Sequence, residues 1–137
     1  MAGKSPTQRT LAALKAQGFP CAIVERWLSQ VWRAPGQGRG VRQDMFGIID
    51  IIALDYSRGV VGVQSTGQGF AQHHRALIED PGKVQASINW LRTPGTALEL
   101  WGWRKVKVKR GGKAMVWAPR VKVYDITDFI DQDILKI

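Results

Sequence analysis

Asp50 is the residue of this sequence best placed to carry chemistry, because it interrupts an apolar, isoleucine-rich run from Phe46 to Leu54. Such a run is typical of a strand buried on both faces. A carboxylate in that position is costly unless a partner neutralises it. A divalent cation, magnesium or manganese, is one such partner, since hard cations prefer carboxylate oxygen. The alternative is a structural aspartate bonded to backbone amides or to an arginine.

The segment from Val60 to Thr66 reads as the next strand, and the turn between the two strands predicts a hairpin. This hairpin would bring Gln64 and the backbone carbonyl of Ser65 close to Asp50. A carboxylate, an amide oxygen and a main-chain carbonyl are suitable magnesium ligands. The alternative is a polar strand end that simply enters a loop.

A second candidate site lies on an alternating run from Ala97 to Lys109. Side chains of a strand alternate between its two faces. One face carries Leu98, Leu100, Val106 and Val108, and the other carries Trp101, Trp103, Lys105, Lys107 and Lys109. Indoles can stack on bases while lysines contact phosphates, so the second face predicts a nucleic-acid interface. The alternative is that the indoles pack under a helix and the lysines solvate an edge strand.

Further arginines extend the predicted nucleic-acid surface. Arg104 lies in the same strand, and Arg39 and Arg42 lie in or just after the glycine-rich segment 34–40. That segment is not a nucleotide-binding loop, because no Gly-Lys-Ser/Thr follows it. We expect it to wrap a nucleic-acid backbone.

Charge and composition favour the same partner. The 137 residues include 20 Lys and Arg against 11 Asp and Glu, a formal net charge of +9. We expect one domain over residues 1–137 whose partner is nucleic acid, most of all DNA. No apolar run is long enough for a membrane span and the first residues lack the apolar core of a signal peptide. Cys21 is the one cysteine, which favours a reducing cytoplasm.

Helix and strand signals alternate along the chain. We expect helices over 6–17 and 70–79, a helix from Pro81 capped by Asp80, and a short closing helix after Asp125. We expect strands within 19–32 and over 46–54, 60–66, 96–109 and 113–123. This order predicts an α/β fold with a mixed β-sheet flanked by helices.

Several stretches together resemble a known family. They are Thr10–Ala12, Val24–Trp27, Arg42–Asp50, Val63–Thr66 and Gly102–Lys105. In their order and spacing they are similar to a small phage and bacterial branch of the PD-(D/E)XK, or restriction-endonuclease-like, superfamily. The resemblance implies an α-β-β-β-α-β core and a magnesium-dependent endonuclease that hydrolyses DNA, with structure-specific, resolvase-like enzymes among its forms. It also implies a homodimer, since nucleases of this fold often pair.

The resemblance assigns roles to single positions. Asp50 takes the place of the metal-binding aspartate, and Gln64 takes the place of the second acid. Thr66 falls where the catalytic lysine stands in the family, which is a departure because threonine supplies no cation.

Residues from elsewhere in the chain could complete such a site. Lys83 and Arg75, on the following helices, are candidates to replace the lysine. Glu25 and Asp44 are candidates for further metal-binding acids. His73 and His74 are adjacent on a helix and so face different directions. They suit a surface or packing role, with phosphate contact or general-base work as the alternative.

Three functions are compatible with these features. The first is a metal-dependent endonuclease. The second is a catalytically degenerate nuclease-fold module that binds DNA or inhibits a host factor, which the missing lysine favours. A protein-binding domain for an acidic partner is the third.

Overall fold

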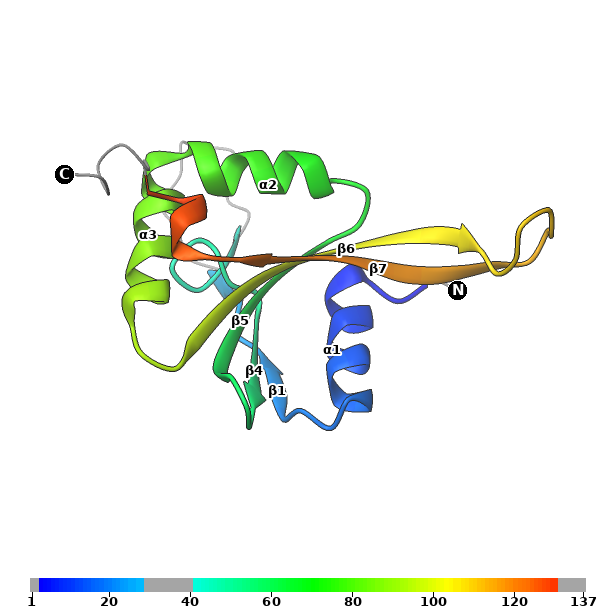
Figure 1. Ribbon diagram of the computed structural model, residues 1–137, viewed down its shortest axis with the longest axis horizontal. Coiled ribbons are helices and arrows are strands. Elements are labelled where there is room, and N and C mark those ends of the chain that lie inside the picture. Colours follow the sequence, from blue (N-terminus) through cyan, green and yellow to red (C-terminus); the bar gives the residue numbers. More distant parts are fainter. Residues whose placement is uncertain (1–2, 29–40, 131–137) are drawn as a thin grey trace.

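The computed structural model describes residues 3–28 and 41–130 and has the form of a mixed sheet between helices (Figure 1). Five strands pair in the order β1-β4-β5-β6-β7, and β2 and β3 form a separate two-stranded sheet. The helices are α1 (Pro6–Ala16), α2 (Phe70–Glu79) and α3 (Pro81–Arg92). The strands are β1 (Cys21–Ile23), β2 (Arg26–Leu28), β3 (Val41–Gln43), β4 (Ile51–Asp55), β5 (Gly59–Thr66), β6 (Thr96–Lys107) and β7 (Met115–Tyr124).

The helix boundaries follow from local capping chemistry. Ser5 and Gln8 form a reciprocal capping box at the start of α1, with Pro6 at the first helical position. Asp80 accepts hydrogen bonds from the amides of Gly82 and Lys83 and so caps α3. These three helices were predicted from sequence and are confirmed. The expected closing helix is a single 3-10 turn, Ile126–Asp128, and residues after 130 lie outside the described part.

The predicted hairpin is present, but its first strand is shorter than expected. β4 begins at Ile51, and the residues before it form a turn in which Phe46 and Gly47 both have positive φ. Antiparallel pairing sets Ile51 opposite Val63 and Asp55 opposite Gly59. The prediction of a continuous strand from Phe46 was therefore wrong, because apolar character alone does not distinguish a buried turn from a buried strand.

Two apolar layers cover the two faces of the sheet. On one face, Leu14 of α1 packs with Val61, Val63, Trp101 and Trp103. On the other face, α2 and α3 cover Leu98 and Leu100. The first half of β6 is thus buried on both sides. The indoles of Trp101 and Trp103 are 5% and 7% exposed, so the expectation that they stack on nucleic acid was wrong. The alternative interpretation, that the indoles pack under a helix, is confirmed. Alternation separated the two faces of the strand but left both interpretations open.

The second half of β6 and its partner β7 extend beyond the body as a two-stranded arm (Figure 1). The side chains of Arg104, Lys105, Lys107 and Lys109 are exposed on this arm. Within the described residues, no helix has both the length and the apolar character that a membrane crossing requires.

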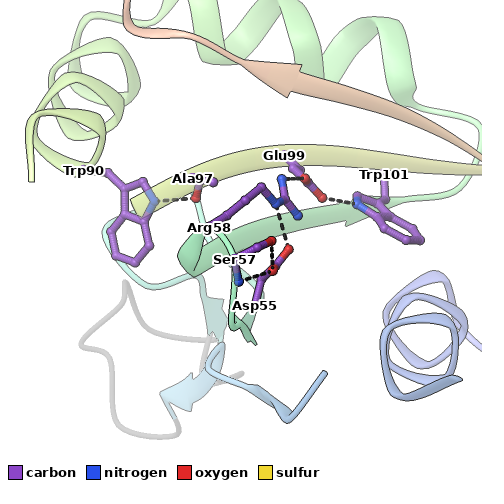
Figure 2. Close-up of polar contacts among 7 residues, drawn as sticks. All are labelled: Asp55, Ser57, Arg58, Trp90, Ala97, Glu99 and Trp101. Carbon is purple, nitrogen blue, oxygen red and sulfur yellow. Dashed lines mark hydrogen bonds and ion pairs between the residues drawn. The ribbon is translucent and has the colours of Figure 1, made fainter. Parts of the chain in front are cut away.

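A polar network ties the β4–β5 turn to β6 (Figure 2). Arg58 donates to Asp55 at 2.8 Å and to Glu99 at 2.6 Å. Glu99 also accepts from the indole N–H of Trp101 at 2.9 Å. The guanidinium lowers the pKa of Asp55 far below its ordinary range. Glu99 is 4% exposed, so its charge depends on Arg58 for compensation.

We expect Arg58→Met to lower the free energy of unfolding by about 2 kcal/mol in urea titrations, because it leaves Glu99 buried without a cation. The value is below that of a fully buried pair, since water reaches part of the arginine. Adding Glu99→Gln should restore part of the loss, because the amide oxygen still accepts from Trp101. Equal stability of wild type and Arg58→Met would contradict this account.

Candidate active site

Asp50 lies at the point where β1, β4 and β5 meet. Its N–H donates to the carbonyl of Val63 at 2.9 Å, and its carbonyl accepts from the N–H of Val24 at 2.8 Å. Its carboxylate Oδ2 accepts from the amide N–H of Ser65 at 2.8 Å. The backbone of Asp50 is therefore fixed from both neighbouring strands, and its side chain is 5% exposed. Ser65 was predicted to face this site through its carbonyl, and the contact that the structure describes is through its amide.

Three acids converge at this point. One carboxylate oxygen from each of Glu25, Asp44 and Asp50 lies within 4.8 Å of the other two. Glu25 lies between β1 and β2, and Asp44 directly follows β3, so the segments at these strand ends bring both to the end of the hairpin. Glu25 and Asp44 are half-buried and Asp50 is buried. The sequence proposed all three as metal ligands, and the structure brings them together.

This crowding changes the protonation of Asp50. Burial, a side-chain hydrogen bond with Asp44, and the negative charges of Asp44 and Glu25 raise the pKa of Asp50 to about 8. The hydrogen bond from the Ser65 amide opposes this rise. Without a cation, the cluster therefore holds a proton that an ordinary aspartate would have lost at neutral pH.

Gln64 adds an oxygen that lacks a partner. Its Nε2 lies 3.5 Å from Oδ2 of Asp44. Among the described residues its Oε1 is buried and accepts no hydrogen bond. An unsatisfied buried carbonyl is costly, so this atom calls for a donor or a cation. The side chain is 5% exposed, and its amide oxygen is the kind of ligand that a hard cation accepts.

Thr66 and Lys83 are the two residues that bear on whether the site has the positive charge of a catalytic lysine. Thr66 is buried at the end of β5, where it offers a hydroxyl and no positive charge. Lys83, in the first turn of α3, donates from Nζ to the carbonyl of Gly47 at 2.7 Å. This bond draws the ammonium toward the turn that precedes Asp50.

A cavity of about 260 Å³ brings together Asp44, Gln64 and Lys83. Its lining residues come from the acid cluster, from β5 and from both α2 and α3. They are Asp44, Gln64, Gln72, His73, Ala76 and Lys83. One wall of the cavity thus carries Asp44 and Gln64. Another carries Lys83, which the sequence proposed as a replacement for the catalytic lysine of the family.

His73 is a lining residue whose role the sequence left open between packing and chemistry. Its Nδ1 lies 2.8 Å from the carbonyl of Gly69, which can only accept, so Nδ1 carries the proton. Gly69 permits this approach, because a Cβ there would lie 3.1 Å from Nδ1. In this tautomer the lone pair of the ring lies on Nε2. The helical spacing of residues 72, 73 and 76 was the signal that could have placed α2 on this cavity.

The other predicted contacts are dispersed. Arg75 is exposed on α2 and does not line the cavity. Arg42 lies in β3, and its side chain is outside the described part. Arg39 also lies outside the described residues.

The pH dependence of the unfolding free energy should reveal the proton that Asp50 holds in the folded state. Its pKa is higher in the folded state than the ordinary 3.8, so the folded state binds more protons between that value and about 8. The free energy of unfolding should therefore fall as pH rises through this window. In chelator-treated protein, we expect Asp50→Asn to remove about 3–4 kcal/mol of this fall between about pH 5 and pH 8.

The difference between the wild-type and Asp50→Asn urea profiles reports the proton held by the acid cluster, since groups outside the cluster titrate in both proteins. Asp55 has a lowered pKa, so its contribution disappears only under acid conditions, below the window. Parallel profiles for the two proteins would refute the assigned pKa.

No protein-family model, curated protein or solved structure matches the chain. The likeness of the stretches around Asp50 and Gln64 to the PD-(D/E)XK superfamily therefore stays a prediction.

Proposed function

We propose that this chain is a metal-dependent endonuclease of restriction-endonuclease-like fold that hydrolyses DNA phosphodiester bonds, with a structure-specific, resolvase-like preference. One observation carries the proposal: three carboxylates, an unpartnered amide oxygen and a lysine gather at the end of one hairpin and its adjoining cavity. Acids and a cation in such proximity are suited to phosphoryl transfer.

The order of elements supports the proposed fold. Helix α1 precedes β1 and the β4–β5 hairpin, and α2 and α3 then lead to β6, which pairs with β5 in parallel. This order resembles the α-β-β-β-α-β core of the family, with β2 and β3 inserted before the hairpin, a second helix α3 before β6, and β7 added after it.

The donor set suits a hard divalent cation. Glu25, Asp44 and Asp50 would hold it through carboxylates, and Gln64 would add its amide oxygen. Magnesium and manganese both accept all-oxygen ligands of this kind. Such a cation, when bound, would offset phosphate charge and make water more acidic.

The protein's own groups would complete the reaction. The ammonium of Lys83 would stabilise charge that develops on the phosphoryl oxygens, in place of the lysine that Thr66 does not supply. His73, with its proton fixed on Nδ1, offers Nε2 as an acceptor for the proton of the attacking water. Gly47 would hold Lys83 in position through its carbonyl.

The exposed cations of the β6–β7 arm would bind the DNA backbone. Arg104 and Lys105 are adjacent on strand β6 and so point to opposite faces, Lys107 shares the face of Lys105, and Lys109 follows the end of the strand. The net charge of +9 favours contact with a polyanion in general. A homodimer would let two such sites act on two strands.

The second candidate is a degenerate nuclease-fold module that binds DNA without cutting it. The observation in its favour is Thr66, which is buried and uncharged at the lysine position. It differs from the nuclease in requiring neither a cation nor Lys83.

Gln64→Met should separate stability from metal binding. It removes a buried oxygen without a partner, so we expect the metal-free protein to gain up to about 1 kcal/mol in unfolding free energy. We expect the rise in melting temperature on adding magnesium to be lost or reduced, because a ligand atom is missing. Gln64→Glu should keep the metal-induced rise. Equal magnesium responses of wild type and Gln64→Met would contradict the proposed ligand set.

Cleavage tests the lysine directly. We expect wild type to cut supercoiled plasmid or a branched DNA with magnesium or manganese, and Asp50→Ala to be inactive. Lys83→Gln should lower the single-turnover cleavage rate by about 10²–10³-fold while leaving DNA affinity within about threefold. Lys83→Arg should recover part of the rate.

Lys15→Gln serves as the matched control, since it removes one lysine charge on α1 and should leave cleavage unchanged. If Lys83→Gln still cuts DNA at the wild-type rate, a residue other than Lys83 must stabilise the charge on the phosphoryl oxygens. Tight binding without cutting by wild type would favour the degenerate module.

A further inference from the structure

A second pocket borders α2 on the side away from the candidate active site, and its lining is basic. Its volume is about 310 Å³, and α2 and β7 supply its walls. The lining residues are Phe70, His74, Arg120, Val121 and Lys122. No acid belongs to this lining, which distinguishes it from the cavity that contains Asp44.

The two cationic side chains of this pocket, Arg120 and Lys122, each lie over an aromatic ring. The guanidinium carbon of Arg120 lies 4.1 Å from the centroid of the Phe70 ring. Lys122 Nζ lies 5.7 Å from the centroid of Tyr124, and 3.9 Å from a carboxylate oxygen of Asp128. Phe70 itself sits over Gly102, where a Cβ would come within 2.7 Å of the ring. Long side chains that are already oriented lose less entropy when they bind a ligand.

His74 supplies a third donor. Its Nδ1 lies 2.7 Å from the hydroxyl of Tyr124, and the two rings stack with centroids 5.7 Å apart. Burial and the charge of Asp128 raise the pKa of Tyr124, so its hydroxyl keeps its proton. When that hydroxyl donates to Nδ1, the neutral imidazole carries its own proton on Nε2.

We propose that this pocket binds a backbone phosphate of the same nucleic-acid strand whose scissile phosphate enters the neighbouring cavity. Arg120, Lys122 and His74 together offer a charged fork, an ammonium and a ring N–H, which match the several acceptor oxygens of one phosphate. The inference rests on the proposed function, because it names a subsite for the substrate of that function.

The place of the pocket relates it to the candidate active site. Phe70 and His74 face this pocket from α2, while Gln72, His73 and Ala76 face the other cavity from the same helix. The two sites thus lie on different sides of α2. A strand that crosses this helix would present one phosphate to each site.

The test measures DNA affinity against salt for a double variant, Arg120→Gln with Lys122→Gln, using a labelled duplex in EDTA so that no cutting occurs. We expect affinity about tenfold weaker than wild type and a slope of log affinity against log salt smaller by about one. His74→Phe keeps the stacked ring and loses the N–H, so we expect a loss of about threefold to tenfold with the slope unchanged.

The matched control is Lys15→Gln with Arg92→Gln, which removes the same charge from the ends of α1 and α3. We expect its affinity to stay within about threefold of wild type and its salt slope to be unchanged. Equal losses in the two double variants would overturn the subsite, because total charge would then explain the binding. Displacement of the duplex by low millimolar inorganic phosphate would overturn it as well, in favour of a free-anion site.

The outcome for the subsite is separable from that for the nuclease. Wild type that cuts DNA while the Arg120 and Lys122 variant binds like wild type would refute the subsite alone. Wild type that binds with the expected salt dependence, lost in that variant, but never cuts would refute the nuclease alone. Absence of DNA binding by wild type would refute both.

Discussion

The hydrogen bond from the Ser65 amide to the Asp50 carboxylate is the interaction on which the rest of the site depends. It is the one described contact that opposes the burial and like charge that raise the pKa of Asp50. The same β5 residue reaches the other face of the sheet, where its hydroxyl lies 2.7 Å from that of Thr10. Thr10 in turn accepts from the indole of Trp103 at 2.8 Å. Helix α1 and strand β6 thereby fix the backbone that orients the acid.

The polar network around Arg58 and the acid cluster around Asp50 differ in how their charges are arranged. Around Arg58, opposite charges compensate each other and the pKa of Asp55 falls. At Asp50, like charges gather and the pKa rises, while Gln64 keeps an unsatisfied oxygen. The first arrangement stabilises the fold, whereas the second, with no cation bound, lowers its stability. Strain of this kind is typical of a functional site, because a purely structural cluster gains nothing from it.

Local signals in the sequence predicted much of this architecture. The Ser5 box, the Asp80 cap with Pro81, and the polar end of β5 each depend on neighbouring residues, and all were found in place. What could not be predicted depends on tertiary packing. Burial of Trp101 and Trp103 requires α1 on that face, and the position of Lys83 requires α3 to dock beside the turn at Gly47. The basic pocket between α2 and β7 joins residues nearly fifty positions apart, such as His74 and Lys122, and sequence spacing carries no signal of it.

The parallel pairing of β5 with β6 has a kinetic consequence. The β4–β5 hairpin closes over a short turn, whereas β6 can join β5 only after residues 67–95 have folded back across the sheet. Local contacts form before contacts that close a long loop. A refolding chain should therefore bring Asp50 and Gln64 together early and receive Lys83 only when the crossover docks. Under the proposed function, the metal ligands would be in place before Lys83, so an incompletely folded chain could capture metal before it could act on a phosphate.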